Sequence, residues 1–265
     1  MRLKDKVALV TGGGKGIGKA ISLAFASEGA TVVVAARDIS KLEETVQEIT
    51  SKGNRAKAIQ TDITDEKQVQ RMVDEAVKEY GQIDILVNNS GIGGPHANVV
   101  DLKLADWNEV LAIDLTGSML CAREALKHMI PRRRGNIINM AAERGRAGDG
   151  RAGSPLRGAY CCAKMGIIGL TETLSVEVGE YNIRVNAISP AGVRGERLVS
   201  VLKGKAQALG VPFEELMAKI TTNYSLGRIA EESEVAATAV FLASDESSAI
   251  TGQTIVTHCG HHTVF

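Results

Sequence analysis

The stretch VALVTGGGKGIGKAISLAFASEGATVVVAARD, residues 7–38, is the strongest indication of fold class in this sequence. Residues 7–10 and 31–36 are short apolar runs, and residues 17–28 between them repeat apolar side chains at helical spacing. Strands that are apolar on both faces are typical of buried parallel sheets. Because parallel neighbours need a helical crossover, the stretch predicts a β-α-β unit.

The same alternation continues to the end of the chain. Strands are predicted at 7–10, 31–36, 56–60, 85–88, 136–140, 184–188 and 254–257, and helices at about 17–28, 40–52, 66–80, 102–130, 159–180 and 231–243. Asp65 is a predicted N-cap, and Gly53 and Gly81 are predicted helix stops. The pattern predicts an α/β fold: one doubly wound parallel sheet of about seven strands, covered by helices on both faces.

No linker or composition break divides residues 1–265, so we expect a single domain. Residues 192–227 interrupt the rhythm, because they are helical in character and contain no predicted strand. In open α/β sheets such an insertion lies near the carboxyl ends of the strands, where ligands bind. We therefore expect a substrate lid there.

The bulk composition excludes several classes of protein. Thirty-one basic residues balance thirty-one acidic ones, which gives no electrostatic case for nucleic acid or an anionic membrane as a partner. The four cysteines form no CxxC pair, and no segment approaches the roughly 20 apolar residues of a membrane span. We expect a cytoplasmic protein with reduced thiols.

The glycine-rich turn after residues 7–10 has the features of a phosphate-binding loop. Gly12, Gly16 and Gly18 fall between a strand and a helix, where glycine lets the backbone approach a pyrophosphate and the helix N-terminus offers free N–H groups. A merely flexible turn is the alternative. Because the loop opens a β-α-β unit, we predict dinucleotide binding.

The end of the second strand bears on the choice of nicotinamide cofactor. A carboxylate there binds the ribose 2′-hydroxyl, whereas a cation accommodates a 2′-phosphate. Ala36 stands where the carboxylate is expected, Arg37 follows, and Lys15 lies in the glycine loop. The pattern favours NADP(H) over NAD(H), although the two cations could be solvated surface charges and Asp38 could still reach the ribose.

Tyr160 and Lys164 are one helical turn apart in the stretch AYCCAK. A tyrosine with its ordinary pKa of ~10 is a poor base at neutral pH, and a neighbouring ammonium favours its ionised form. The pair can therefore transfer a proton.

Taken together, these motifs resemble the short-chain dehydrogenase/reductase family, and the resemblance covers nearly the whole chain. The matching stretches are TGGGKGIG (11–18), TDITD (61–65), NNSG (88–91), YCCAK (160–164), IRVNAISPAGV (183–193) and FLASDESSAITGQTIV (241–256).

The resemblance implies a Rossmann-type domain in which Tyr160 is the acid or base and Lys164 also binds the nicotinamide ribose. It implies a homodimer or homotetramer assembled through the helices at 102–130 and 159–180. The implied cofactor-binding residues are Gly12, Lys15, Gly16, Ile17, Gly18, Arg37, Asp62, Ile63, Asn89, Gly91, Tyr160, Lys164, Pro190 and Val193.

The sequence departs from the family pattern at two catalytic positions. Ala142 stands where the family has a serine that hydrogen-bonds the reacting oxygen, and losing such a donor typically costs ~10²–10³ in rate. Asp114 stands in place of the asparagine that helps to keep a water on the lysine. The family's PG reads Pro190-Ala191, and its VDGG reads Thr257-His258-Cys259-Gly260.

The segment between Ala142 and Tyr160 is longer than in the family pattern, and the excess matches the repeat GRAGD at 145–149. We expect a lengthened loop beside the substrate cleft. Ser154, Arg144 or Arg151 could supply the missing donor, Glu143 could act as a base or a substrate contact, or efficient redox chemistry could be lost. The charged residues could also be solvated loop charges.

The predicted function is an NADP(H)-dependent oxidoreductase acting on the carbonyl or alcohol group of a small molecule. The alternatives are a non-redox enzyme on the same scaffold, using Tyr160 or Glu143 for proton abstraction or elimination, and a nucleotide-binding pseudoenzyme. His258, His261 and His262 lie in the terminal stretch HCGHH. Because adjacent histidines rarely converge on one metal, we predict no metal site and favour a subunit contact for this tail.

Overall fold

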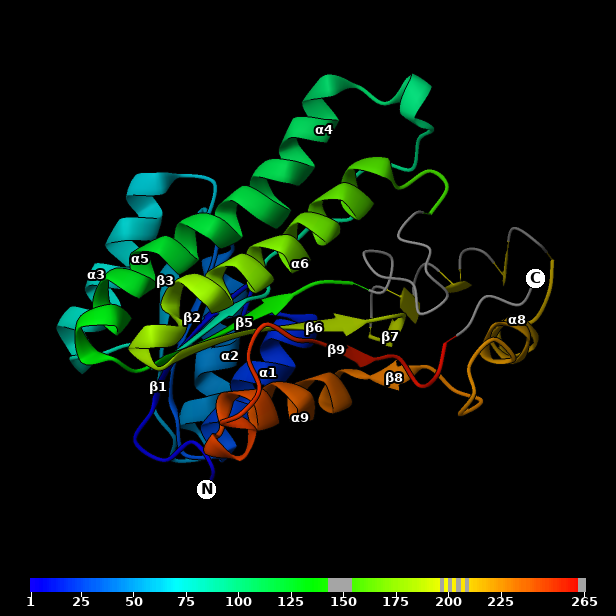
Figure 1. Ribbon diagram of the computed structural model, residues 1–265. Coiled ribbons are helices and arrows are strands. Elements are labelled where there is room, and N and C mark those ends of the chain that lie inside the picture. Colours follow the sequence, from blue (N-terminus) through cyan, green and yellow to red (C-terminus); the bar gives the residue numbers. More distant parts are fainter. Residues whose placement is uncertain (143–153, 196–197, 200–201, 204–205, 208–209, 262–265) are drawn as a thin grey trace.

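The structure is a computed structural model that describes residues 1–142, 154–195, 198–199, 202–203, 206–207 and 210–261 (Figure 1). A seven-stranded parallel sheet forms its centre, in the order β3-β2-β1-β4-β5-β6-β9. Its strands are β1 Val7–Thr11, β2 Thr31–Ala36, β3 Ala56–Gln60, β4 Ile85–Asn88, β5 Gly135–Met140, β6 Ile183–Pro190 and β9 Thr254–Thr257. All seven predicted strands are confirmed, as is the single-domain, doubly wound α/β fold.

Helices cover both faces of the sheet, as Figure 1 shows: α3, α5 and α6 lie on one face, and α1, α2 and α9 on the other. The helices are α1 Gly16–Ser27, α2 Ile39–Thr50, α3 Glu66–Tyr80, α4 Leu104–Leu111, α5 Gly117–Arg132, α6 Gly158–Val178, α8 Phe213–Thr221 and α9 Glu232–Ala243. Single turns of 3₁₀-helix occur at Val99–Asp101, Gly179–Tyr181 and Asp245–Ser247.

Alternating side chains of each strand feed two separate cores. In β2, Val33 and Ala35 belong to the core under α3 and α5, whereas Val32 and Val34 belong to the core under α1 and α9. Successive side chains of a strand point to opposite faces, so a strand between two helical layers must be apolar throughout. The continuous apolar runs in the sequence have this cause.

The helix ends follow the expected chemistry at two of the three positions. Asp65 caps α3 by accepting the backbone N–H groups of Lys67 and Gln68, and Gly81 ends that helix in the left-handed conformation with φ +78°. Both predictions are confirmed. Helix α2 ends earlier than predicted, at Thr50, and Gly53 (φ +79°) lies in the turn that follows.

Two expectations about secondary structure were wrong. The helix predicted at 102–130 is two α-helices, α4 and α5, joined by the π-helical turn Ala112–Thr116. The segment 192–227 does contain a strand: β7, Val193–Arg194, pairs in parallel with β8, Ala230–Glu231. A strand of two residues is too short to show a periodicity in sequence. None of the described helices has the length and apolar character needed to cross a membrane.

Candidate active site

The carboxyl ends of β1 and β4 form the centre of the site, because the strand order reverses between these neighbours. The side-chain amide of Asn89, directly after β4, donates to the carbonyl oxygens of Thr11 (3.0 Å) and Gly12 (3.3 Å). The hydroxyl of Thr11 accepts the backbone N–H groups of Asn89 (3.0 Å) and Ser90 (3.1 Å). These four bonds fix the loop after β4 against the glycine loop after β1.

Two glycines of the glycine loop have no room for a side chain. A Cβ at Gly18 would lie 2.2 Å from the carbonyl oxygen of Gly12, and Gly12 itself has φ +66°. The side chain of Lys15, at the N-cap of α1, makes no capping hydrogen bond, so the first N–H groups of α1 are left for a ligand. An exposed backbone cradle at a helix N-terminus fits the pyrophosphate of a dinucleotide.

Two cations lie near this cradle, Lys15 in the glycine loop and Arg37 directly after β2. Asp38 accepts the hydroxyl of Ser40 (2.7 Å) and the backbone N–H of Lys41 (3.3 Å), which caps α2. The hydrogen bond from Ser40 makes the largest contribution to lowering the pKa of Asp38 from its usual value. The backbone hydrogen bond from Lys41 lowers that pKa further. Lys15 and Arg37 are exposed, and among the described residues neither has an ion-pair partner.

The remaining predicted nucleotide contacts lie on the neighbouring strand ends. Asp62, two residues after β3, accepts the backbone N–H and the hydroxyl of Thr64 at 2.9 and 2.8 Å. Ile63 is buried against Gly117, where an added Cβ would lie 2.6 Å from the isoleucine side chain. Ile17 packs partly buried on the α1 side of the sheet.

Lys164 lies in the interior of the site, on α6, with a relative exposure of 5%. Its ammonium donates to the carbonyl oxygen of Met140 at 3.0 Å and lies 3.2 Å from Oδ2 of Asp114. The same ammonium is 5.7 Å from the centre of the Tyr160 ring. The structure therefore brings together the three predicted catalytic residues, which come from α6 and the π-helical turn.

Asp114 is held by one hydrogen bond and one ion pair. Its Oδ1 accepts the backbone N–H of Ile92 at 2.7 Å, while Oδ2 faces the Lys164 ammonium. No described residue donates a conventional hydrogen bond to Oδ2, so this contact is Coulombic. The carboxylate is 1% exposed and lies in the π-helical turn, an irregularity that is frequent at functional sites.

The predicted substrate residues are only partly described. Ala142 is buried just past β5, and the N–H of the preceding Ala141 donates to the carbonyl of Ile188 at 2.9 Å. Ser154 is half-buried, and its carbonyl accepts the N–H of Arg157, the N-cap residue of α6, at 3.2 Å. Glu143, Arg144, Arg151 and the GRAGD repeat lie outside the described residues, so their predicted roles stay predictions.

The far wall of the site comes from the chain after β6. That strand ends at Pro190, and Val193 begins β7 by pairing with Ala230. A Cβ at Gly192 would lie 3.0 Å from the hydroxyl oxygen of Tyr224, so this loop packs closely on the chain that follows α8.

The C-terminal tail packs against the same chain. The His261 ring lies 4.5 Å from the Tyr224 ring, and Nδ1 of His258 accepts the backbone N–H of Gly260 at 3.0 Å. His262 lies outside the described residues.

Two residues of the site were missed by the sequence reasoning. The guanidinium carbon of Arg157 lies 4.3 Å from the centre of the Tyr160 ring, and its Nη1 lies 3.2 Å from Nε2 of His96. The three-residue spacing of Arg157 and Tyr160 was a usable signal, because side chains at that spacing meet on a helix. His96 is 61 positions from Arg157, and no local pattern points to it.

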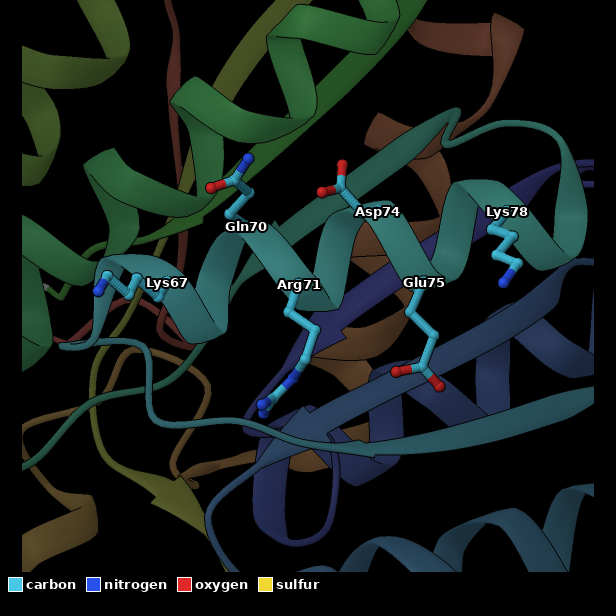
Figure 2. Close-up of a pocket in the computed structure, with 6 residues that line it drawn as sticks. All are labelled: Lys67, Gln70, Arg71, Asp74, Glu75 and Lys78. Atoms are coloured by element: carbon cyan, nitrogen blue, oxygen red, sulfur yellow. The ribbon is translucent and has the colours of Figure 1, made fainter.

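A hollow of about 420 Å³ lies along α3, away from these residues. Figure 2 shows the side chains that line it. Its six lining side chains all project from α3: Lys67, Gln70, Arg71, Asp74, Glu75 and Lys78. Three cations and two carboxylates on one helix form a solvated charged face, and no functional group of the sheet edge reaches it. A second hollow of about 440 Å³ lies between α8 and the β7–β8 pair, with Phe213 and Ile229 in its wall.

Comparison with known proteins agrees with the geometry. A family model described as enoyl-(acyl carrier protein) reductase matches residues 12–262. The 3-oxoacyl-(acyl-carrier-protein) reductase of Thermotoga maritima is 38% identical over 257 residues, which are 96% of this chain and 97% of that protein.

Two solved structures share the whole fold. NAD⁺-bound xylitol dehydrogenase superposes with a TM-score of 0.89 at 32% identity and covers 98% of this chain and 100% of its own. An actinorhodin polyketide ketoreductase with NADPH gives 0.88 at 32% identity and covers 96% of each chain. With its glycine loop, its Tyr160-Lys164 pair and these matches along nearly its full length, the chain belongs to the short-chain dehydrogenase/reductase family of oxidoreductases.

Proposed function

We propose that this protein is an NADP(H)-dependent oxidoreductase that reduces a carbonyl group, or oxidises an alcohol, of a small molecule. The observation that carries the proposal is the position of Tyr160 and the buried Lys164 at the same sheet edge as the glycine cradle. A dinucleotide in the cradle and a substrate at Tyr160 would share this edge.

In the reducing direction the substrate carbon gains a hydride and its oxygen gains a proton. A nicotinamide cofactor supplies the hydride when it is bound. The Tyr160 hydroxyl donates the proton to the carbonyl oxygen, and the Lys164 ammonium stabilises the negative charge that develops on the phenol oxygen. In the oxidising direction Tyr160 takes the proton from the alcohol.

The preference for NADP(H) rests on charge. A 2′-phosphate next to Lys15 and Arg37 would meet two exposed cations, and Asp38, the carboxylate directly after Arg37, is occupied as the cap of α2. The two related structures contain NAD⁺ in one case and NADPH in the other, so we infer the preference from the residues of this chain.

The substituted positions give the site its own character. Ala142 supplies no hydrogen-bond donor, and Asp114 places a carboxylate against Lys164. We propose that the chemistry relies on Tyr160 and Lys164, with the residues after Ala142 forming part of the substrate wall. We also propose that residues 192–227, which include α8, act as the substrate lid of the single domain 1–265.

Binding and turnover measured together test the function. We expect the purified protein to bind NADPH more tightly than NADH and to oxidise NADPH, followed at 340 nm, with members of a ketone and aldehyde panel. Tyr160→Phe should abolish turnover and keep NADPH binding, while Tyr181→Phe, in the 3₁₀ turn after α6, should change neither. Tight NADPH binding without turnover on any substrate would favour the pseudoenzyme or non-redox alternatives.

The cofactor preference has its own test. Arg37→Ser should raise the Kd for NADPH by about 10-fold or more and leave that for NADH unchanged, because only NADPH carries the additional phosphate. Arg55→Ser is the matched control, since Arg55 is an exposed arginine at the opposite, amino end of β3. Tighter binding of NADH than of NADPH by the unaltered protein would refute the charge argument.

We propose that the protein assembles as a homodimer or homotetramer through α5 and α6. These helices carry exposed apolar side chains, including Met119, Met165 and Val176. A second copy of the chain that packs on α5 and α6 would remove these side chains from water. Light scattering after size-exclusion chromatography should give two or four times the chain mass, and a monomer would reject the proposal.

A further inference from the structure

We propose that Arg157 and His96 form an anion-binding site beside Tyr160, and that the substrate carries a carboxylate a few bonds from its reacting carbonyl or alcohol carbon. The proposal rests on the function proposed above. It adds the chemical class of the substrate, an oxo acid or hydroxy acid, which neither the motifs nor the relatives assign.

The backbone fixes this pair of side chains in place. Ala97 and Arg157 form an isolated parallel β-bridge, in which the Ala97 N–H donates to the carbonyl of Leu156 at 3.2 Å. Gly158 packs against Val99, since an added Cβ would lie 3.1 Å from that side chain. The loop after β4 is thereby tied to the start of α6, one turn before Tyr160.

Arg157 has the features of a cation prepared for a ligand. Its guanidinium is stacked on the Tyr160 ring at 4.3 Å, within cation–π range. Among the described residues no carboxylate lies within ion-pair distance of it, whereas Arg132, Arg123 and Arg228 all have acidic partners. A stacked guanidinium without a counter-ion is pre-organised for a planar anion, which it binds through two parallel hydrogen bonds.

His96 completes the site as a second donor. A guanidinium can only donate, so Nε2 of His96 must accept the hydrogen bond at 3.2 Å. The imidazole proton of the neutral ring is then on Nδ1, where it can donate to a bound anion. His96 is exposed and the Arg157 side chain is half-buried, so a ligand can reach the pair from solvent.

The position of the site favours a carboxylate that belongs to the substrate itself, and not an anion that binds away from the reacting carbon. The guanidinium lies over the Tyr160 ring, so a carboxylate bound to it would be a few bonds from an oxygen that accepts the Tyr160 proton. A neutral ketone would leave the Arg157 guanidinium without an anionic partner among the described residues. Binding energy from the carboxylate would therefore orient the reacting carbon.

Matched acids and esters test the proposal. We would measure kcat and KM with NADPH for 2-oxohexanoate, 4-oxohexanoate and 5-oxohexanoate and for their methyl esters. At least one acid should exceed its ester in kcat/KM by about 10-fold or more, as expected for a charged hydrogen-bonded pair. Arg157→Met should bring the ratio of kcat/KM for the acid to that for the ester close to one, mainly by raising KM for the acid.

A second arginine provides the matched control. Arg133 also lies over a tyrosine ring, 5.7 Å from the centre of Tyr181, but far from the sheet edge that holds Lys164. Arg133→Met should leave the acid-to-ester ratio as it is in the unaltered protein. If Arg157→Met lowered kcat/KM equally for the acid and the ester, Arg157 would act only through the Tyr160 ring, and the anion site would be overturned.

A binding measurement separates this proposal from the proposed function. Titration calorimetry of the NADPH-loaded protein should detect hexanoate binding that Arg157→Met weakens about 10-fold or more, and hexanol binding that it does not change. If no substrate is turned over and hexanoate still binds through Arg157, the anion site stands and the redox function fails. If ketones are reduced without any preference for acids, the redox function stands and the anion site is rejected.

Discussion

Replacing Asp114 by asparagine tests whether this carboxylate and Lys164 act as a buried ion pair. Two donors face the side chain: the Ile92 N–H at 2.7 Å from Oδ1, and the Lys164 ammonium at 3.2 Å from Oδ2. An amide has one oxygen and one NH₂ group. In either orientation Asp114→Asn therefore turns N–H donors toward another donor, in a position that is 1% exposed.

The magnitude follows from these two contacts. A hydrogen bond to a charged group contributes about 1.5–3 kcal/mol, and removing one partner of a buried ion pair costs about 3–5 kcal/mol. Asparagine keeps the volume and one acceptor, so we expect Asp114→Asn to lower the free energy of unfolding by about 2–3 kcal/mol. For a domain of this size that corresponds to a fall of about 4–12 °C in Tm.

Lys164→Met provides the second side of a double-mutant cycle. Without the ammonium, Asp114 is an unpaired buried charge, so exchanging it for a neutral amide should be neutral or stabilising. The coupling between the two positions is then at least about 2 kcal/mol, well above the ~0.5 kcal/mol within which independent sites add.

Urea unfolding can be followed through Trp107, the single tryptophan, which packs against the cluster that contains Tyr160. Protein concentration is held fixed, because association would change the apparent stability. Asp101→Asn, on an exposed turn, is the control and should stay within about 0.5 kcal/mol of the unaltered protein. Equal destabilisation by Asp114→Asn in the presence and absence of Lys164 would refute the ion pair.

Three further predictions concern other parts of the chain. Ala142→Ser should raise kcat on small ketones by about 10- to 100-fold by restoring a donor near the reacting oxygen, with NADPH affinity unchanged; a lower kcat would mean that the pocket is shaped around alanine. Gly18→Ala should abolish NADPH binding in fluorescence titrations, because its Cβ would lie 2.2 Å from a loop carbonyl oxygen. The control is Gly169→Ala on α6, where an added Cβ would meet no atom within 4 Å; it should keep NADPH binding intact and stabilise the helix by about 0.5–1 kcal/mol. Equal NADPH binding by the two variants would contradict the close contact between Gly18 and the loop carbonyl. Burial raises the pKa of Cys121 to about 12, so its thiol should stay protonated at pH 8 and resist Ellman's reagent until urea unfolds the chain. The exposed Cys162 should react in the native protein. Mass spectrometry of labelled peptides would show which of the two cysteines has reacted.

The strands and helices could be predicted because each follows from a pattern of neighbouring residues in the sequence. Residues 32–35 of β2 are apolar in succession since both faces of that strand are covered, and residues 66–80 repeat their apolar side chains on one face since α3 covers the sheet on one side. These patterns need no knowledge of the neighbours. The positions of the seven strands follow from them, and the glycine loop follows from its place between a strand and a helix.

The π-helical turn shows the limit of such reading. Residues 102–130 have one helical pattern in the sequence, but the wider turn at Ala112–Thr116 divides them. The irregularity places Asp114 opposite Lys164, which is fifty positions away. A helical period in the sequence indicates which face of a helix is buried. It does not indicate where one residue is inserted into a turn, or which side chain of another helix that residue will face.

The sequence alone determined the sheet, the glycine cradle and the one-turn spacing of Tyr160 and Lys164, because backbone periodicity and i,i+4 spacing are properties of neighbouring residues. Only the tertiary structure decided that Asp114 contacts Lys164 and that Arg157 lies between His96 and the Tyr160 ring. Those contacts depend on the register of strands and the path of the loop after β4. Packing of the whole chain sets both, and no short stretch of sequence encodes them.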